Sequence, residues 1–555
     1  MKKEFESNVQ YIKYLVNKEV AKRFFHGSLE KGPFLERDIA ESIIPGPKAM
    51  FRCCIYKERH IIEDRVHLIL EPTKGDVVIN VLDSACDECP IDRFVVSDSC
   101  RGCLGHKCQE NCPRGAISIV NHRAYINQEL CIECGRCKAV CPFGAISEVM
   151  RPCMRACSVG AVKMDENRKA MIDHEKCISC GACVHQCPFG AIVDKSFVMN
   201  VLNLLRDSFN NTNYHVYAAV APAVASQFGD VKVGQVFAGI KELGFYDVVE
   251  AAIGGDMVAI AETEEVAETI EEKKWKTTSC CPAFVDYIRK YHPNLMDHVS
   301  TTVSPMIAIG RAIRAKDPLA KVVFIGPCTA KKVEIKQPDV KGAIDYVLTF
   351  EELRAMFDGK DLDLANLPEV NAGDPSSYGR IFARTGGVAE SVRRVAKLEG
   401  VEAEINPLRC DGIDECIKAL KLASFGRLPE NLIEGMACKG GCTNGAASIF
   451  HDTRGIQRVN MFSREALTDD PTEGIRGYDM KSINMERDYP ELKKEPAAEE
   501  ETVKEAAKEE KEVKKETKKE TPKEETAKKE TAPKATKPRK TKAKEAAEAE
   551  TTEKA

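Results

Sequence analysis

The pattern of apolar and polar positions changes along the 555-residue chain. In residues 1–85, apolar side chains recur at helical spacing from about Tyr11 to Phe25, and a strand-like run, DVVINVLD, ends just before Cys86. We therefore expect a helix and a strand in this N-terminal region. Its pattern indicates no function.

Residues 213–490 alternate apolar runs with helical stretches. The runs VYAAVAPAVA, YDVVEAAIGG, KVVFIGP and AIDYVLTF are short, nearly continuous and punctuated by glycine. Such runs are typical of buried, largely parallel strands covered by helices. We predict an α/β domain here and expect it to carry the catalytic site.

The last residues, 493–555, have a different composition. They consist almost wholly of Lys, Glu, Ala, Thr and Pro, and Val503 and Val513 are their only large apolar residues. A segment of this kind buries too little apolar surface to offset the entropy of ordering. We expect a disordered tail, with an interaction segment as the alternative.

Composition narrows the class of protein. The chain is 43% hydrophobic, its net charge is -5, and it contains 25 cysteines. Nearly balanced charge gives no indication of nucleic acid or an anionic membrane as partner. No run approaches the roughly 20 apolar residues of a membrane span, and the first 20 residues are too charged for a signal peptide. We expect a cytoplasmic protein whose cysteines bind metal rather than form disulfides.

A short repeat runs through residues 86–195. Four segments read alike: CPRGAI at Cys112, CPFGAI at Cys141, CSVGAV at Cys157 and CPFGAI at Cys187. Repetition of this kind indicates duplicated units that pack on one another.

The repeat carries two cysteine runs with the spacing C-x2-C-x2-C-x3-C-P. These are Cys131, Cys134, Cys137 and Cys141, and Cys177, Cys180, Cys183 and Cys187. This is the spacing of bacterial ferredoxins, in which the fourth cysteine usually ligates the neighbouring 4Fe-4S cluster. Zinc fits less well, because its sites favour paired C-x2-C hooks that lie far apart.

Further cysteines extend the series. A looser run predicts a third cluster: Cys100, Cys103, Cys108 and Cys112. Another four could complete a fourth cluster, exchange ligands with the others or remain unliganded: Cys86, Cys89, Cys153 and Cys157. Three or four clusters in series form a path for single electrons, and such a path must end at a redox centre.

Three segments outside the runs offer that centre. They are TSCCPAFV with Cys280 and Cys281, IGPCTAKKVE with Cys328, and EGMACKGGCTNGA with Cys438 and Cys442. Each alone fits a buried free thiol as well as a ligand. Together they provide five thiols, one more than a 4Fe-4S cube needs.

With these three segments in this order after ferredoxin-like runs, residues 86–489 resemble the iron-only, or [FeFe], hydrogenases, most closely the group B branch. The resemblance implies ferredoxin-like 4Fe-4S repeats followed by an α/β domain that binds the H-cluster. In the family this cofactor is a 4Fe-4S cube joined through one cysteine to a diiron unit bearing CO, cyanide and a dithiolate bridge.

Residue roles follow from the resemblance, motif by motif. Cys281, Cys328, Cys438 and Cys442 would hold the cube, and Cys442 would also bridge to the diiron unit. Cys280 is then free to exchange protons with the amine of the dithiolate bridge, a role that suits an ordinary thiol pKa of about 8.5. Lys331 would donate to a cyanide and Glu334 would orient Lys331.

The family's proton path and cofactor pocket can also be carried over. Glu262, Ser300 and Glu265 match the glutamate, the serine and the outer glutamate, and E-x-x-E spacing places both glutamates on one helix face. A charged helix face is the alternative interpretation. Pro222, Ala223 and Met436 match residues around the cofactor.

The sequence departs from the family at several positions. Ala223 follows Pro222 where a serine is frequent, and Met306 stands for a glutamine. Gly326 replaces a methionine, and Phe284 replaces a tryptophan. Such changes affect the surroundings of the cofactor, so they bear on rate and catalytic bias.

The resemblance implies a hydrogenase that interconverts two protons, two electrons and H2. Ferredoxin or a similar small carrier is the expected electron partner, and hydrogenase maturases would supply the diiron unit. One alternative is a non-enzymatic iron-sulfur assembly protein like the nuclear-prelamin-binding proteins. Another is an H2 or redox sensor that retains the H-cluster.

Overall fold

The computed structural model describes residues 5–29, 32, 34–52, 54–71, 77–87, 89 and 92–489. The tail expected at 493–555 lies outside these residues, as does Cys53, to which the sequence assigns no role. Cys54 is exposed.

Three helices form the N-terminal region. They are α1 (Asn8–Phe25), α2 (Leu35–Ile43) and α3 (Ile55–Leu70), and they enclose a small apolar core that includes Val20 and Ile39. α1 begins after Ser7, whose hydroxyl accepts a hydrogen bond from the backbone of Gln10 and so caps the helix. The helix expected from Tyr11 to Phe25 is therefore confirmed.

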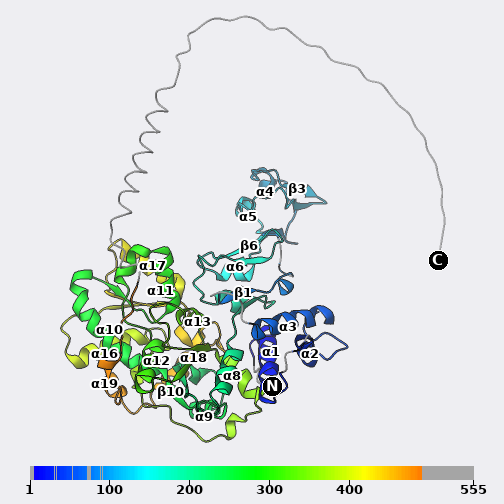
Figure 1. Cartoon of the computed structure of the whole chain (residues 1–555). Helices are drawn as coiled ribbons and strands as arrows, with labels where there is room; N and C mark the ends of the chain where they lie inside the picture. The colour runs from blue at the N-terminus through cyan, green and yellow to red at the C-terminus, as the bar shows by residue number, and fades with distance from the viewer. Residues whose placement is uncertain are drawn as a thin grey trace, which may run out of the picture. The chain divides into compact units, whose positions relative to one another are not determined.

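Residues 79–194 build four antiparallel strand pairs. The pairs are β1 (Ile79–Val81) with β8 (Ile192–Asp194), β2 (Phe94–Val96) with β5 (Ile146–Glu148), β3 (Ile117–Val120) with β4 (Arg123–Ile126), and β6 (Val162–Met164) with β7 (Ala170–Ile172). In Figure 1, β3 lies with α4 (Lys107–Glu110) and α5 (Arg136–Val140). The strand expected before Cys86 is β1.

The repeated C-P-x-G-A-I motif has one structural meaning throughout. A short helix ends at the cysteine, a glycine turns the chain, and a strand begins. The four helices are α4, α5, α6 (Pro152–Ala156) and α7 (Ala182–Gln186). The turning glycines have φ between +58° and +63°, which explains glycine here: Gly115, Gly144, Gly160 and Gly190. These are ferredoxin-like repeats, as predicted.

The larger domain contains two parallel sheets. The first has the order β10 (Asp247–Glu250), β9 (Val216–Val220), β12 (Lys321–Ile325) and β13 (Tyr346–Leu348). The second has the order β11 (Lys276–Thr277), β15 (Leu432–Met436) and β14 (Pro407–Asp411). Every strand pair in both sheets is parallel, which confirms the α/β prediction.

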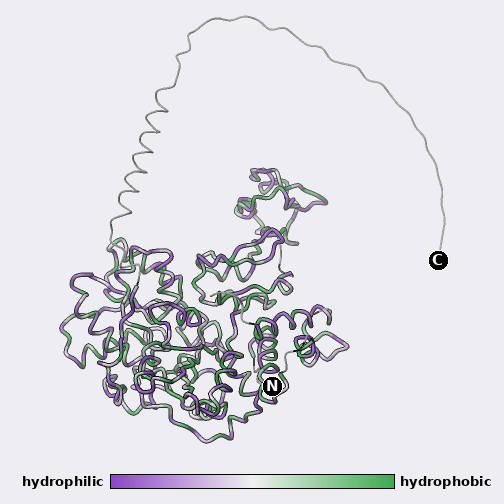
Figure 2. Tube along the Cα trace, in the orientation of Figure 1, coloured by the Kyte–Doolittle hydropathy of each residue, from purple (hydrophilic) through white to green (hydrophobic). Residues whose placement is uncertain are grey.

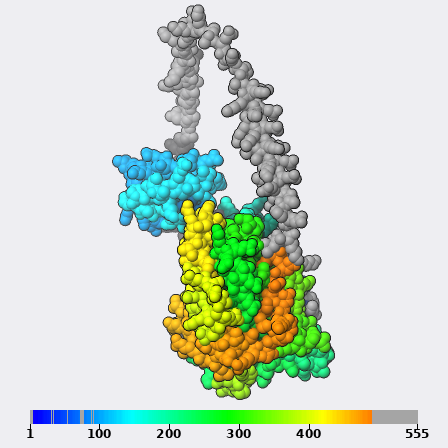
Figure 3. Space-filling view, turned by 90° about the vertical axis from the view of Figure 1, so that its left-hand side faces the viewer, coloured from blue at the N-terminus to red at the C-terminus, as the bar shows by residue number. Residues whose placement is uncertain are grey.

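Helices cover these sheets. They are α8 (Val198–Asp207), α9 (Val233–Glu242), α10 (Ala251–Lys273), α11 (Pro282–Tyr291), α12 (Pro305–Lys316), α13 (Lys331–Glu334), α14 (Phe350–Gly359), α15 (Ser377–Ile381), α16 (Gly387–Glu399), α17 (Ile413–Ser424), α18 (Arg454–Ser463) and α19 (Pro471–Gly474). Phe284 of α11 and Leu420 of α17 share a core with Ile433 of β15. The green and yellow segments that meet in Figure 3 are this part of the molecule.

The parallel strands determine where the cysteine-bearing segments gather. Cys280 and Cys281 follow β11, Cys328 follows β12, and Cys438 follows β15. Ligands of parallel α/β sheets bind outside the carboxyl ends of the strands. The fold thus brings three segments, far apart in the sequence, to one place.

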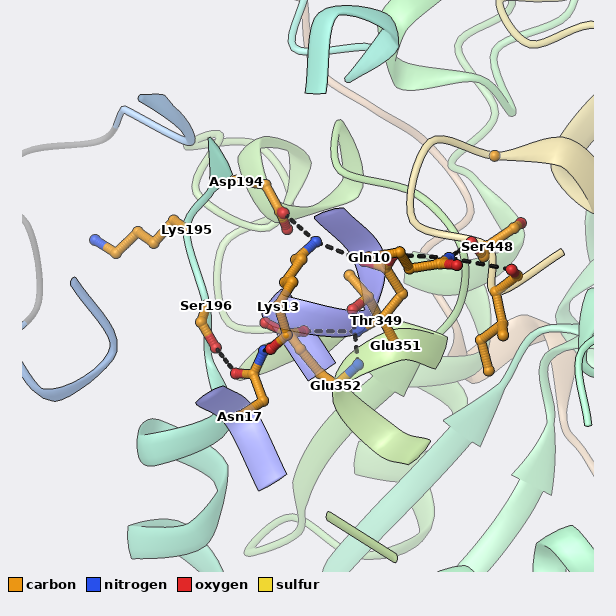
Figure 4. Close-up of polar contacts among 12 residues, drawn as sticks. Gln10, Lys13, Asn17, Asp194, Lys195, Ser196, Thr349, Glu351, Glu352 and Ser448 are labelled. Atoms are coloured by element: carbon orange, nitrogen blue, oxygen red, sulfur yellow. Dashed lines mark hydrogen bonds and ion pairs between the residues drawn. The ribbon is translucent and has the colours of Figure 1, made fainter. Parts of the chain in front are cut away.

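A buried ionic network joins α1 to the rest of the chain (Figure 4). Lys13 Nζ lies 2.7 Å from Asp194 and 2.5 Å from Glu351. Lys332 Nζ, next in sequence to Lys331, lies 2.9 Å from Asp194 and 3.1 Å from Glu352. Removing one partner of a buried ion pair is strongly destabilising, so the network fixes α1, β8, α13 and α14 against one another.

Among the described residues, no helix combines the length and apolar character that crossing a bilayer requires. The trace in Figure 2 shows short hydrophobic stretches interrupted by hydrophilic ones.

Candidate active site and metal centres

Eight cysteines in residues 100–141 separate into two groups of four. One pocket is lined by Cys100, Cys103, Cys108 and Cys141. A second pocket is lined by Cys112, Cys131, Cys134 and Cys137. The last cysteine of each run joins the other group, which is the ligand exchange expected from the spacing.

The other eight cysteines of the repeats follow the same rule. Burial raises the pKa of Cys183, and the charges of Cys180, Cys177, Cys157 and, last in size, Cys153 raise it further. Burial raises the pKa of Cys153 to about 11, with additional contributions from Cys187, Cys89 and Cys86. These neighbours favour two groups: Cys157, Cys177, Cys180 and Cys183, and Cys86, Cys89, Cys153 and Cys187. Cys86 and Cys89, left open by the sequence, lie near Cys153 and are candidates for a fourth site.

One hydrogen bond recurs in these sites. The backbone N–H of the alanine four residues after the last cysteine donates to that sulfur in every repeat: Ala116 to Cys112 at 3.2 Å, Ala145 to Cys141 at 3.4 Å, Ala161 to Cys157 at 3.2 Å and Ala191 to Cys187 at 3.3 Å. Hydrogen bonds to cluster sulfurs are one means of setting reduction potential. Four thiols with this support fit a 4Fe-4S cluster at each site.

The three remaining segments bring together a fifth quartet. Burial raises the pKa of Cys442 to about 12, and the nearby charges of Cys328 and Cys281 contribute. The pKa of Cys438 is raised well above its usual value by burial and by the charges of Cys328, Cys281 and Cys442. Four half-buried thiols that lie this close together are a donor set that a metal cluster deprotonates and satisfies. The residues fit the cube of an H-cluster.

A cavity opens beside this quartet. It contains about 570 Å³ of empty space, open solvent at its mouth included, and Cys442 and Cys328 reach it from the quartet. Its other lining residues include Pro222, Cys280, Met306, Phe324, Lys331 and Met436. The wall is mostly apolar, with the Lys331 ammonium group and three thiols, of which only that of Cys280 lies outside the quartet. Such a wall suits a compact anionic cofactor that must be shielded from water.

Lys331 is held as the resemblance implied. Its Nζ lies 3.1 Å from Glu334 Oε2 and donates to Ser304 Oγ at 3.2 Å. Although burial opposes it, the charges of Glu334, Cys328 and Cys442 raise the pKa of Lys331. Glu334 also lies 3.4 Å from Arg487 Nη1. Lys331 is therefore a buried cation at the cavity wall.

Cys280 also lines the cavity. It is 8% exposed, and its thiol lies 3.9 Å from the Thr278 hydroxyl. Burial raises the pKa of Cys280 well above the usual thiol range, and the charge of Glu262 adds to the shift. Burial thus favours the protonated thiol more strongly than the ordinary pKa of about 8.5 used in the sequence analysis.

Glu262, a residue of α10, is close enough to Cys280 for its charge to affect that thiol. Its Oε1 accepts a hydrogen bond from the Ser279 backbone at 3.2 Å, while its Oε2 is buried without a hydrogen-bond partner among the described residues. Burial raises the pKa of Glu262 to about 8, the charge of Glu265 contributes, and the Ser300 hydroxyl acts in the opposite direction. Glu262 is thus suited to hold a proton near neutral pH.

Ser300 and Glu265 are the next residues of the expected proton path. The Ser300 hydroxyl donates to Glu265 Oε2 at 2.5 Å, and Glu265 pairs with Lys276. Although burial opposes it, the charge of Lys276 lowers the pKa of Glu265. Both glutamates lie on one face of α10, as the E-x-x-E spacing predicted. Ser300 therefore contacts Glu265 and influences Glu262, whose charge in turn affects Cys280.

Some predicted contacts differ. Pro222 lines the cavity, but Ala223 is fully buried and is not among the lining residues. A side chain on Gly326 would meet Phe324 and Ala221 within 3.2 Å. A glycine at position 326 therefore avoids a clash with these two side chains.

Sequence reasoning missed Glu434, which precedes the Cys438 motif. It is fully buried, and its carboxylate accepts hydrogen bonds from the backbone of Gly386 at 2.8 Å and Ala389 at 3.0 Å. Burial raises the pKa of Glu434 to about 7. The sequence does contain a signal that could have identified Glu434, because it is a charged residue inside the apolar run LIEGMA.

Comparison with known families agrees with this geometry. The family "Iron only hydrogenase large subunit, C-terminal domain" matches residues 214–446. A 4Fe-4S double cluster binding domain matches residues 130–190, and a 4Fe-4S dicluster domain matches residues 99–145. The chain accordingly contains 4Fe-4S cluster domains and an H-cluster domain.

Individual relatives include hydrogenases. The chain is 32% identical over 378 residues to the periplasmic [Fe] hydrogenase large subunit of Nitratidesulfovibrio vulgaris, covering 58% of this chain and 86% of that protein. It is 27% identical over 312 residues to iron hydrogenase 1 of Clostridium pasteurianum, covering 47% of this chain but only 54% of that protein. Among solved structures, [FeFe]-hydrogenase HydA1 of Chlamydomonas reinhardtii aligns with a TM-score of 0.41 and 22% identity, covering 49% of this chain and 91% of the other.

A relative of another class is also similar. The cytosolic Fe-S cluster assembly factor NAR1 of Yarrowia lipolytica is 26% identical over 193 residues, covering 32% of this chain and 37% of that protein. Family membership therefore leaves activity undecided. With the cube cysteines, the cavity and the match to most of a known hydrogenase subunit, the chain belongs to the iron-only, or [FeFe], hydrogenase family.

Proposed function

We propose that this protein is a hydrogenase that catalyses the reversible reaction of two protons and two electrons to H2. Electrons would pass over the 4Fe-4S sites to or from ferredoxin or a similar small carrier. The observation that carries the proposal is Cys280. It is a buried thiol outside the cube quartet, yet it lines the same cavity as Cys442 and Lys331.

Proton delivery is the chemistry that these residues support. When bound, the H-cluster supplies the metal site at which H2 is formed or split. A proton taken up at Glu265 would pass through the Ser300 hydroxyl to Glu262, and then to Cys280 Sγ. The pKa of Glu262, raised to about 8, lies near neutrality and suits a group that gives and regains a proton, while burial of Cys280 favours the protonated thiol that would face the cofactor.

The cavity wall has a second task. Lys331 would donate a hydrogen bond to an anionic ligand of the cofactor, with Glu334 and Ser304 holding its ammonium group in place. Apolar side chains such as Phe324 and Met436 exclude water from the same space. Exclusion of water strengthens every electrostatic interaction inside the cavity.

Electron supply is supported by the contact between the last ferredoxin-like loop and the quartet. The Thr329 hydroxyl, next to Cys328, donates to the Ser179 carbonyl at 2.7 Å. Gly181 packs so closely that an added Cβ would lie 2.5 Å from Ala446. The site that includes Cys180 thus adjoins the cube quartet directly, as the last step of an electron path requires.

The alternative is a non-enzymatic assembly factor, favoured by the similarity to NAR1. That role would require the cube cysteines but not Cys280, Lys331 or the glutamate path. A third possible function is that of an H2 or redox sensor. Such a sensor would retain the cube cysteines, Cys280, Lys331 and the glutamate path but would react slowly. For the proposed enzyme, maturases would supply the diiron unit, and we propose the cytoplasm as its compartment.

Isotope exchange tests the proposal without a physiological electron partner. The matured protein in D2O under H2 should release HD, and the same protein without the diiron unit should not. Exchange at a rate far below that of a working hydrogenase would favour the sensor. Absence of exchange in protein shown to carry the complete cofactor would contradict both and leave the assembly role.

A further inference from the structure

Three side chains from distant parts of the sequence meet outside the active-site cavity. They are Glu6, just before α1; His185, in α7; and His451, just before α18. One ligand atom from each lies within 4.8 Å of the other two, and the two imidazole rings have centroids 3.9 Å apart. None of the three takes part in the proposed proton or electron path.

The hydrogen bonds of His451 place a constraint on this cluster. Its Nε2 lies 2.8 Å from the carbonyl oxygen of Gly445, and its Nδ1 lies 2.8 Å from Glu6 Oε2. A carbonyl oxygen can only accept, so Nε2 carries the hydrogen. In a neutral imidazole Nδ1 then presents a lone pair, and two acceptors would face each other at contact distance. This contact is favourable only if a proton is shared by Nδ1 and Glu6 or if a metal ion, lying to one side of the line that joins them, binds both atoms.

The surroundings favour the metal ion. A second imidazole, His185, points to the same place and would be superfluous in a simple ion pair. Metal-binding histidines almost always donate their other ring N–H to a carbonyl or carboxylate, and His451 does so with Gly445. Two imidazoles and one carboxylate are a donor set for Zn2+ and for non-haem Fe2+.

We propose that Glu6, His185 and His451 bind a divalent transition-metal ion of the Zn2+ or Fe2+ class, with water completing its coordination. His185 is exposed, which leaves an entry path for the ion. His185 and His451 also line a cleft together with Cys180 and Cys438. The ion would thus tie the start of the N-terminal region to the junction between the last accessory site and the cube quartet.

Zinc is the probe that tests this site. The anaerobic, cluster-loaded full chain is equilibrated with a small excess of Zn2+, separated from free metal, and analysed for zinc per chain and by zinc X-ray absorption. We expect about one zinc with nitrogen and oxygen ligands at about 2.0–2.1 Å and an imidazole signature. The variants E6Q, H185Q and H451Q should each weaken zinc binding by about tenfold or more.

His215→Gln is the matched control. His215 lies 2.7 Å from Asp317 and stacks on Tyr246 with ring centroids 3.8 Å apart, but no second imidazole joins it in that pairing. This variant should bind zinc like the parent. Iron content and far-UV circular dichroism of every variant should match the parent, and H185Q, on an exposed side chain, is the substitution least able to disturb folding.

Three results would overturn the proposal. Zinc bound through sulfur at about 2.3 Å would show that it occupies cysteine sites. Equal zinc binding by H451Q and the parent would place the ion elsewhere. Absence of bound zinc and iron from this site in the parent would mean that a proton fills the gap and that His451 and Glu6 form an ion pair only.

Discussion

The accessory cysteine sites and the cube quartet gather four thiols in different ways. Three of the accessory groups each take three cysteines from one short loop, such as Cys131, Cys134 and Cys137, and the fourth from a neighbouring run. The quartet takes its cysteines from three segments that follow β11, β12 and β15. Local sequence is enough for the first kind of site, whereas the second depends on the whole domain.

The difference extends to what surrounds the sulfur atoms. The accessory sites pair each last cysteine with a backbone N–H and use every thiol of the repeats. The quartet has a cavity beside it, a buried cation in Lys331, and a thiol, Cys280, left over. A site that only passes electrons needs no spare thiol. A site that also handles protons does.

The largest expected effect is that of Cys442→Ala. Cys442 is the quartet member that, with Cys328, reaches the cavity, so its loss should remove the diiron unit and all H2 chemistry. Infrared bands of metal-bound CO and cyanide report this directly. Cys416→Ala is the control, because Cys416 is a fully buried thiol outside the quartet. An intact diiron spectrum in Cys442→Ala would show that the ligand assignment is wrong.

Cys280→Ala should separate cofactor binding from turnover. We expect unchanged CO and cyanide bands and a fall in H2 evolution of about 10²–10⁴-fold, the usual contribution of a general acid or base. Rates with a reduced viologen dye measure this without a protein partner. Normal turnover in the variant would refute the proton role of Cys280.

Glu262→Gln should slow turnover about 10²-fold and change the pH dependence of stability. The pKa of Glu262 rises on folding to about 8, so the folded protein binds this proton more tightly than the unfolded chain. The stability gained is complete below about pH 4.5 and is lost as pH rises through 8. The melting temperature of the parent relative to Glu262→Gln should therefore fall between pH 5 and 9.

Glu264→Gln controls for the helix, because Glu264 is exposed on α10. It should alter neither the rate nor the difference in melting temperature across this pH range. A parent and a Glu262→Gln variant that melt in parallel from pH 5 to 9 would argue against a protonated, buried Glu262.

The smallest effect on hydrogen chemistry itself should come from Cys134→Ala. Cys134 is an exposed member of one accessory group. We expect the variant to lose about four iron atoms, keep its CO and cyanide bands, and evolve H2 from reduced viologen within a few fold of the parent. Loss of the CO and cyanide bands would mean that the accessory sites and the cube quartet do not assemble independently.

Much of this arrangement was predictable from sequence because its signals are local. The repeated segments that end in C-P-x-G-A-I or its variant indicated duplicated units, and E-x-x-E spacing placed Glu262 and Glu265 on one helix face. The runs KVVFIGP and VYAAV were recognisable as buried parallel strands. Each of these inferences needs only neighbouring residues.

What sequence could not supply depends on distant contacts. The pairing of Cys86 and Cys89 with Cys153 and Cys187 requires β1 to pair with β8 across most of the repeats. The burial of Lys13 in an ionic network with Asp194 requires three separate parts of the chain. A charged residue on an N-terminal helix carries no local mark of such a role.

The most direct test of the central claim is infrared spectroscopy of the anaerobically matured protein, first under argon and then under H2. The account predicts bands of metal-bound CO and cyanide that shift when H2 is added. Such bands should persist in Cys280→Ala. Absence of the bands after competent maturation would contradict the hydrogenase assignment and leave an iron-sulfur protein of the assembly or electron-transfer kind.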